Sequence, residues 1–341
     1  MENKILRKYF HKQNICIIPL TELRNYKVSL LPKESRLICQ QELISRFYDN
    51  LIDTSVDHSF VIILKTSEKF IYLASAVVYE CNSIVCGGEP EGPITLYFNE
   101  NLYDDQKAKL TELVLNNYTN SFSSKEIYIS LHPFSESLIK PFKKYFESES
   151  ALLVPLAGRY IYLDSTYAQT RLNYRKSVKP LINKTLRKFS FKVSHNIDAH
   201  ELFPLFEEYK NLHFVVSGRL TRSEESWLSQ KTMLTSGVAF MLVIYDNLIP
   251  IGAAFFVSEG NVLHYWSGAY NREYTTMGLS HLAVDYAINW SYENNIRFFN
   301  FGSPQIIQDN ISSEKLKKLS HFRQAFSSSM SIGSNIRISM K

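Results

Sequence analysis

The sequence has little of what marks extracellular, metal-binding or membrane-spanning proteins. Only four of the 341 residues are cysteine, and none of them form the C-x-x-C spacing of a zinc or redox site. The apolar run at residues 238–245 has the length of a strand and is too short to cross a bilayer. No signal-peptide core precedes Pro19. These absences predict a cytoplasmic protein with reduced thiols, no metal site and no membrane span.

Glycine and proline are also scarce, with 12 and 11 residues, whereas Phe and Tyr number 22 and 21. This balance excludes collagen, low-complexity sequence and disorder. The chain is about twice as long as a ~150-residue domain, so we expect two domains.

One order of predicted secondary-structure elements occurs twice, without any repeat in the amino-acid sequence itself. Hydrophobic periodicity predicts these elements in the first half: a helix over 37–51, strands over 60–65 and 70–75, a helix over 103–118 and a strand over 126–130. In the second half it predicts helices over 198–213 and 223–234, strands over 238–245, 249–257 and 262–270, a helix over 278–293 and a strand over 297–301. The pattern predicts an α/β fold with mixed sheets.

Acidic residues are absent from residues 171–192, a segment that holds eight cations: Arg171, Arg175, Lys176, Lys179, Lys184, Arg187, Lys188 and Lys192. The rest of the chain has 30 basic and 33 acidic residues, so the net charge of +5 arises entirely in this segment. Pro180 is expected to break it into two helical pieces. Two interpretations stay open, a solvated linker helix and a positive rim that faces a polyanionic ligand.

Several motifs occur in an order that is typical of one family. They are the basic run Arg171–Lys176, the strand Leu263–Tyr270, the helix Leu279–Trp290, the Phe299–Gly302 run, and the segment His321–Ser327. That last segment is similar to a Phe-Lys-x-x-Phe-Gly signature, with Arg323 in place of Lys and Ser327 in place of Gly. In this order the sequence resembles the FemABX-type proteins, which have two tandem GNAT (N-acetyltransferase-like) folds. The resemblance covers the second half well and the first half by element order. It implies two tandem GNAT-like domains, residues 1–168 and 169–341, with the acyl-donor site in the second.

The fold alone does not separate the chemistries of that family. The chain lacks a helical-arm insertion and looks most like the bacterial nucleotide-sugar N-acyltransferases. This likeness implies transfer of an acyl group from acyl-CoA to the primary amine of a dTDP- or UDP-linked amino sugar for surface polysaccharide such as lipopolysaccharide O-antigen. The alternatives are an aminoacyl-tRNA-dependent ligase of cell-wall precursors and a non-catalytic glycan-precursor-binding member. The expected ligands are coenzyme A and the nucleotide sugar, and no nucleic acid is expected to bind. Both a monomer and a homodimer are compatible with the sequence.

The resemblance places the pantetheine arm of CoA between two parallel strands that part, 262–270 and 297–301, and its pyrophosphate at the start of the intervening helix. GNAT enzymes usually have Gln/Arg-x-x-Gly-x-Gly/Ala there. This chain reads Thr275-Thr-Met-Gly278-Leu-Ser280, which keeps the central glycine. The expected CoA-binding residues are Trp266, Gly268, Ala269, Arg272, Thr275, Met277, Gly278, Leu279, Ser280 and His281.

Acyl transfer to an amine needs a base that removes a proton from the ammonium group. His264 is the histidine of strand 262–270, and an unperturbed imidazole has a suitable pKa of ~6.5. A core histidine is the alternative interpretation. Tyr265 and Ser267 are further catalytic candidates, and strand alternation turns them away from the His264 face unless a bulge intervenes. A backbone amide near residues 266–268 is expected to polarise the thioester carbonyl. No Tyr follows Gly302 to protonate the leaving thiolate. Ser303 or water protonates it instead, or the thiolate departs unprotonated.

A nucleotide diphosphate needs cations around it, and we expect the acceptor in a cleft between the domains. Arg175, Lys176 and Arg323 are the expected phosphate ligands, and Arg46 is a further candidate. Glu89, with Glu91, is a second candidate base from the first domain, with a polar turn as the alternative interpretation.

Overall fold

The computed structural model describes residues 14–51, 56–81, 84–87, 94–121, 126–131, 139–148, 150–157, 160–163, 166–301, 321–326 and 332–339. Contacts between residues divide the chain into two compact units. Unit 1 comprises residues 1–156 and 333–341, and unit 2 comprises residues 157–332. Glu89 and Glu91, Gly302, Ser303 and Ser327 lie outside the described residues.

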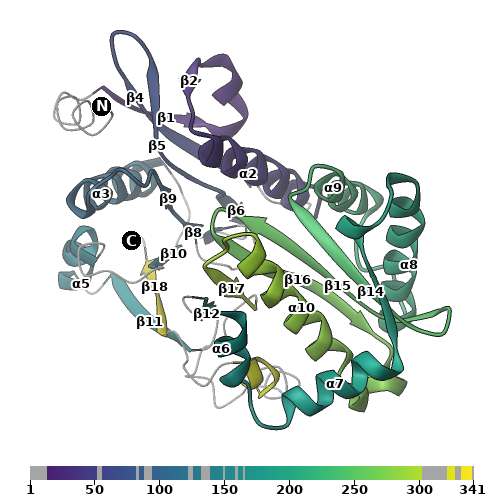
Figure 1. The fold of residues 1–341 in the computed structure, drawn as a ribbon. Coiled ribbons are helices and arrows are strands. Elements are labelled where there is room, and N and C mark those ends of the chain that lie inside the picture. Colours follow the sequence, from purple (N-terminus) through teal and green to yellow (C-terminus); the bar gives the residue numbers. More distant parts are fainter. Residues whose placement is uncertain are drawn as a thin grey trace. The chain divides into compact units, whose positions relative to one another are not determined.

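Unit 1 contains two sheets of mixed direction. The first has the order β1-β4-β5-β2, with β9 paired to β5, and the second has the order β11-β18-β10-β7-β6-β3, with β8 paired to β10 (Figure 1). The strands are β1 (Ile15–Pro19), β2 (Val28–Ser29), β3 (Val56–Asp57), β4 (Phe60–Lys65), β5 (Phe70–Ala76), β6 (Tyr79–Cys81), β7 (Ile84–Cys86), β8 (Ile94–Thr95), β9 (Tyr97–Phe98), β10 (Glu126–Leu131), β11 (Ala151–Ala157) and β18 (Ile332–Ser339). The helices are η1 (Leu20–Asn25), α2 (Pro32–Leu51), α3 (Asp104–Ser121), η2 (Lys140–Phe142) and α5 (Lys143–Glu147).

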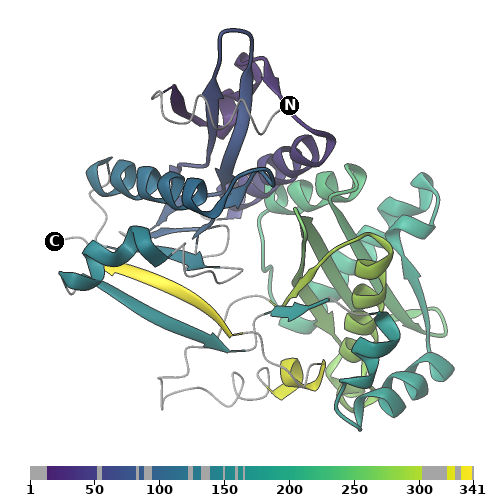
Figure 2. The same ribbon diagram turned by 60° about the vertical axis from the view of Figure 1, so that its left-hand side comes forward.

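The strand β18 returns to unit 1 after the chain has passed through unit 2. It lies between β11 and β10, antiparallel to β10, with Ile338 opposite Ile127 (Figure 2). Ile336 and Ile338 are fully buried in the core of this unit. The sequence-based division assigned this segment to the second domain. Its inward-facing isoleucines pair with a strand more than 200 residues earlier in the chain, which local periodicity does not reveal.

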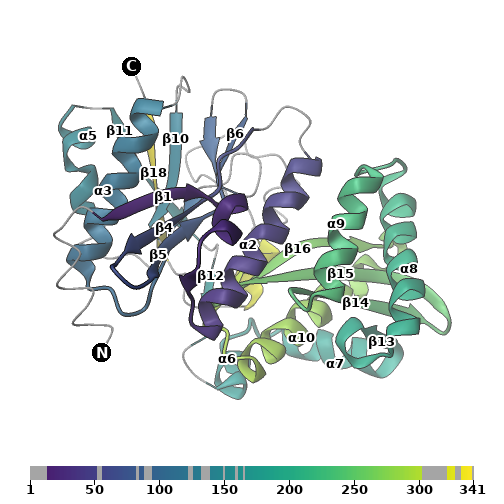
Figure 3. The same ribbon diagram turned by 90° about the horizontal axis from the view of Figure 1, so that it is seen from above.

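Unit 2 is a single six-stranded sheet between two helical layers. The strand order is β12-β17-β16-β15-β14-β13, and Figure 3 shows α8 and α9 on one face with α7 and α10 on the other. The strands are β12 (Tyr160–Tyr162), β13 (Ser190–Val193), β14 (Ala239–Asp246), β15 (Ile249–Glu259), β16 (Val262–Tyr270) and β17 (Phe298–Asn300). The helices are α6 (Tyr167–Leu172), α7 (Val178–Lys188), η3 (Ser194–Asn196), α8 (Ala199–Ser217), α9 (Glu224–Thr235), η4 (Arg272–Met277), α10 (Leu279–Glu293) and η5 (Gln324–Phe326).

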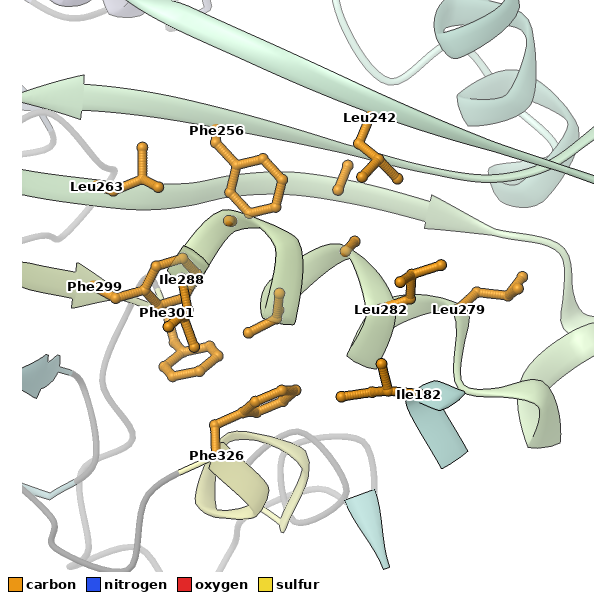
Figure 4. Packing of buried hydrophobic residues seen from close by; sticks show 14 of the residues in the cluster. Ile182, Leu242, Phe256, Leu263, Leu279, Leu282, Ile288, Phe299, Phe301 and Phe326 are labelled. Carbon is orange, nitrogen blue, oxygen red and sulfur yellow. The ribbon is translucent and has the colours of Figure 1, made fainter. Parts of the chain in front are cut away.

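The core of unit 2 forms around α10. Figure 4 shows Leu282 and Ile288 of this helix between Phe256 and Phe299 of the sheet on one side and Phe326 on the other. Burial of such large apolar side chains is the main force that holds the helix on the sheet. The helices and strands predicted from periodicity in both halves are present, with ends that differ by a few residues.

The basic segment forms two helices, as predicted, but the break is not at Pro180. The chain leaves the helical path at Asn173–Ser177, and Pro180 is the third residue of α7. A proline fits there because the first four N–H groups of a helix have no intrahelical acceptor. Not every cation faces outward, since Nε of Arg171 lies 3.2 Å from Oδ1 of the buried Asp285.

Candidate active site in unit 2

Two parallel strands of unit 2 part at one point. The pairing of β16 with β17 runs through three positions and ends at His264 opposite Asn300. β16 continues to Tyr270, whereas β17 ends at Asn300. In the described part of the chain, no strand pairs with β16 on this side beyond His264. The edge from Tyr265 to Tyr270 therefore presents backbone N–H and C=O groups that an extended ligand can pair with.

A β-bulge lies in β16 at the same point. Tyr265 is opposite Phe256 of β15 and Ser267 is opposite Phe255, so Trp266 is the extra residue. The bulge reverses the alternation of side chains beyond it. His264 and Ser267 consequently point to the face covered by α8, and Tyr265 points to the face covered by α10.

His264 is held between two side chains at the point where the strands part. Nδ2 of Asn300 donates to Nδ1 of the ring at 2.9 Å, and Oε2 of the buried Glu259 lies 3.5 Å from Nε2. A carboxylate at Nε2 favours the tautomer with its proton on Nε2 and a lone pair on Nδ1. The imidazole can accept a proton at Nδ1 once the hydrogen bond from Asn300 to that atom is broken.

Ser267 belongs to an aromatic cluster on the α8 face. The hydroxyl groups of Tyr209 and Ser267 form a hydrogen bond of 2.6 Å, and the Tyr209 ring stacks on Phe255. His213, one turn later in α8, packs edge-on against Tyr209 and against Trp227 of α9. Burial, helped by the charge of Arg222, lowers the pKa of His213 to about 3. This imidazole is therefore neutral at physiological pH.

The aromatic cluster predicts an acid-sensitive unit 2. Because the pKa of His213 is lower in the folded state than its unfolded value near 6.5, its contribution to stability is complete above pH 6.5 and is lost as the pH falls toward 3. We expect the unfolding free energy to fall by up to about 1.4 kcal/mol per pH unit in this window. Urea titrations at several pH values should show a shallower slope for His213→Gln. The exposed His200 gives the matched control, because His200→Gln should keep the wild-type slope, and equal slopes for all three proteins would refute the prediction.

Tyr265 does not share a face with the other two catalytic candidates. Its hydroxyl lies 3.0 Å from that of Tyr270, and burial raises its pKa to about 12 despite that hydrogen bond and the nearby charge of Arg323. A Cβ atom at Gly268 would lie 2.1 Å from the Tyr265 hydroxyl, so the glycine makes room for the ring. The sequence left open whether a bulge intervenes, and the bulge at Trp266 puts Ser267 on the face of His264 and leaves Tyr265 on the other.

The start of α10 follows β16 through η4, and it holds most of the other predicted CoA ligands. Gly278 has φ +73° and precedes the first helical residue, and no side chain caps the helix or places an acid in its first turn. A Cβ atom at Gly278 would lie 2.5 Å from Cγ of Leu181 on α7. Uncapped N–H groups at a helix N-terminus attract phosphate. Trp266, Gly268 and Ala269 lie on the end of β16 beyond its pairing with β17, Arg272, Thr275 and Met277 on η4, and Leu279, Ser280 and His281 in the first turn of α10.

His281 is a packed ring and contributes no positive charge to this helix start. It lies against Phe322 and Phe326, and burial, together with the charge of Arg175, lowers its pKa to about 4. Arg272 and Thr275 are exposed on η4. Among the predicted ligands around this turn, Arg272 is therefore the cation that can reach a phosphate.

The predicted acceptor cations are divided between the two units. In unit 2, Arg175 is bound to His321, with 2.7 Å between Nη1 and Nε2, and its backbone N–H donates to Ala325. Lys176 is exposed beside it, and Arg323 is half-buried. Arg46 is exposed on α2 of unit 1.

Three residues near the parting strands were missed by the sequence reasoning: Tyr209, Glu259 and Asn300. Glu259 could have been found, because the two-residue turn after it directs the chain back so that Glu259 and His264 share a face. Tyr209 and Asn300 come from elements distant in sequence and carry no local signal.

Comparisons with known proteins define the class of this chain. Residues 168–306 match the family model of an acetyltransferase (GNAT) domain. The structure resembles that of FemX (9% identity, TM-score 0.55, covering 94% of this chain and 96% of FemX). It also resembles L-PGS from Bacillus licheniformis (11% identity, TM-score 0.51, 89% and 90% covered). A conserved protein of unknown function from Bacteroides thetaiotaomicron VPI-5482 is similar too (11% identity, TM-score 0.51, 95% and 98% covered). No curated protein sequence matches the chain.

The protein therefore has the tandem GNAT fold, with mixed sheets in both halves as the sequence predicted. Residues 168–306 are similar to a GNAT acetyltransferase domain, the chain has a FemX-like architecture, and the matched region contains the parted strands and the start of α10. In the described residues, no helix is long and apolar enough to span a bilayer, and no group of three His, Cys, Asp or Glu could hold a metal ion.

Proposed function

We propose that this protein is an N-acyltransferase that moves an acyl group from acyl-CoA to a primary amine. The observation that carries the proposal is the parting of β16 and β17. A bulge at Trp266 lies at the same point, and the uncapped N-terminus of α10 follows β16 in the chain. The residues fit CoA: the edge of β16 beyond His264, where no strand of the described residues pairs with it on the β17 side, offers pairing groups to pantetheine, and the helix start offers N–H groups to the pyrophosphate. Acyl-CoA would supply the activated thioester.

The residues of β16 provide two further requirements of the reaction. The bulge at Trp266 interrupts the regular pairing of β16 with β15, and a backbone N–H of residues 266–268 is the proposed donor to the thioester oxygen as negative charge develops on it. On the α8 face, His264 accepts the proton of the amine at Nδ1, and Glu259 stabilises the resulting imidazolium at Nε2. Asn300 holds Nδ1 until the amine or a water molecule replaces it.

As the acceptor we propose the amine of a nucleotide-linked amino sugar, dTDP- or UDP-linked, in the cytoplasmic synthesis of bacterial surface polysaccharide. Support comes from the resemblance of the sequence and from Arg323, a half-buried cation within electrostatic range of Tyr265 on the parted edge. A half-buried guanidinium can bind a diphosphate through paired N–H donors.

Calorimetric titration tests the donor, and a substrate panel tests the acceptor. CoA should bind saturably, and thiol release from acyl-CoA should require one of a set of dTDP- and UDP-amino sugars. Absence of CoA binding together with turnover of an aminoacyl-tRNA would replace this proposal by the tRNA-dependent ligase. Binding of sugar nucleotide without thiol release from any acyl-CoA would indicate a non-catalytic protein.

Arg323→Ala should raise the KM for the nucleotide sugar about tenfold with little change in kcat, because a hydrogen bond to a charged group is worth ~1.5–3 kcal/mol. Steady-state kinetics at saturating acyl-CoA measure both constants. Arg219→Ala, which removes an exposed cation between α8 and α9, is the matched control and should leave KM unchanged. A wild-type KM for Arg323→Ala would place the diphosphate elsewhere.

A further inference from the structure

The exposed side of α7 is a row of cations that the fold does not use. The helix buries Val178, Ile182 and Thr185 against α10 and η4. The side away from these residues presents the exposed Lys184, Arg187 and Lys188, the half-buried Lys179 lies at the flank of the helix, and the exposed Lys176 precedes it; we call these five residues the α7 cationic face. None of them forms an ion pair with an acid in the described part of the chain.

The hairpin between β14 and β15 ends in an apolar tip. Asn247, with φ 56°, makes the turn, and Leu248 and Ile249 are 91% and 67% exposed. The turn geometry needs Asn247 but gives no reason for a leucine and an isoleucine in water. Two adjacent aliphatic side chains at such exposure indicate a contact outside unit 2.

The tip and the α7 cationic face are neighbours within unit 2. β13 follows α7 directly and pairs antiparallel with β14, with Ser190 opposite Tyr245, so the residues beyond Tyr245 lie toward the end of α7. Phe189 packs edge-on against Tyr274, whose hydroxyl donates to Asp246 at the base of the tip. Lys188 lies over the Phe189 ring. Figure 3 shows α7 beside β13.

We propose that the hairpin tip and the α7 cationic face form one surface that docks unit 2 on an anionic lipid membrane. Lysine and arginine attract acidic headgroups, and adjacent aliphatic side chains enter the headgroup boundary. A nucleic acid fits less well, because its bases stack on aromatic or guanidinium planes and offer nothing to leucine and isoleucine. Two acids lie beside this surface: Asp246, which accepts a hydrogen bond from Tyr274 and keeps its negative charge, and Glu273, which is exposed on η4. This peripheral docking is a function beyond acyl transfer and does not depend on it.

Sedimentation of the full chain with lipid vesicles tests the proposal. We expect binding to vesicles of phosphatidylcholine mixed with phosphatidylglycerol and none to phosphatidylcholine alone. Leu248→Ser/Ile249→Ser should lower the partition coefficient at least about tenfold. Lys184→Ala/Arg187→Ala should lower it by about twentyfold, and high salt should act in the same direction.

Matched variants separate this surface from general charge and hydrophobicity. Leu228→Ser removes an exposed leucine of α9, and Lys27→Ala/Lys109→Ala removes two exposed cations of unit 1, and both should bind vesicles like the wild type. Circular dichroism checks that every variant is folded. Failure of the folded wild type to bind acidic vesicles would overturn the proposal. Tight, salt-sensitive binding of bulk tRNA would also overturn it, if Lys184→Ala/Arg187→Ala weakens that binding and Leu248→Ser/Ile249→Ser does not. The cations would then be an RNA-binding site.

Discussion

Replacing His264 with asparagine should lower kcat by about a hundredfold, within the ~10²–10⁴ range of a lost general base. The affinity for CoA should stay within about twofold, because His264 points to the α8 face whereas the proposed pantetheine partner is the backbone edge of β16. Thiol-release assays give kcat, and calorimetric titration gives the affinity for CoA. Asparagine can keep a polar contact with Asn300, so the strand pairing next to it is preserved.

Two partner substitutions make the test specific to proton transfer. Glu259→Gln removes the carboxylate beside Nε2 and should lower kcat about tenfold, with CoA binding retained. Asn300→Ala frees Nδ1 and should leave more activity than His264→Asn. An unchanged kcat in His264→Asn would show that the ring only holds β17 against β16.

Replacing Gly278 with alanine should lower the unfolding free energy by about 2–4 kcal/mol and weaken CoA binding by more than about tenfold. Alanine at φ +73° is strained, and its Cβ atom would meet Cγ of Leu181 at 2.5 Å. Relief of that contact moves the start of α10, whose N–H groups are the proposed pyrophosphate ligands. Urea denaturation and CoA titration measure the two effects.

A double-mutant cycle with Leu181→Ala separates strain from contact. Leu181→Ala removes the atoms that the new Cβ would meet, so Leu181→Ala/Gly278→Ala should lose less stability than the sum of the two single variants. The backbone strain at residue 278 remains in the double variant. Gly218→Ala is the matched control, since Gly218 also has positive φ but an added Cβ there meets nothing within 4 Å. It should cost about 1–2 kcal/mol and leave CoA binding intact. Additive losses in the cycle would show that Leu181 does not constrain Gly278.

Sequence periodicity predicted the long helices and several central strands of both halves, including the strand that carries His264, because burial of one face imposes a regular spacing of apolar residues. It did not predict β1, β11, β12 or β18. It did not predict the bulge at Trp266, which depends on how β15 and β16 pair. Nor did it predict Arg171 paired with Asp285, since charge counts treat every cation in the 171–192 segment as free. Side chains that meet across sheets or between distant helices, such as Tyr209 with Ser267, lie beyond any local pattern.

The position of β18 sets the order in which the two units can be completed during synthesis. This strand separates β11 from β10, so before it is made the sheet of unit 1 has a gap in its interior and exposes the edge of β10. All of unit 2 is synthesised in the meantime, and domains generally fold as units. The nascent chain therefore carries an open strand edge through the synthesis of about half its length, when chaperone protection of unit 1 would matter most.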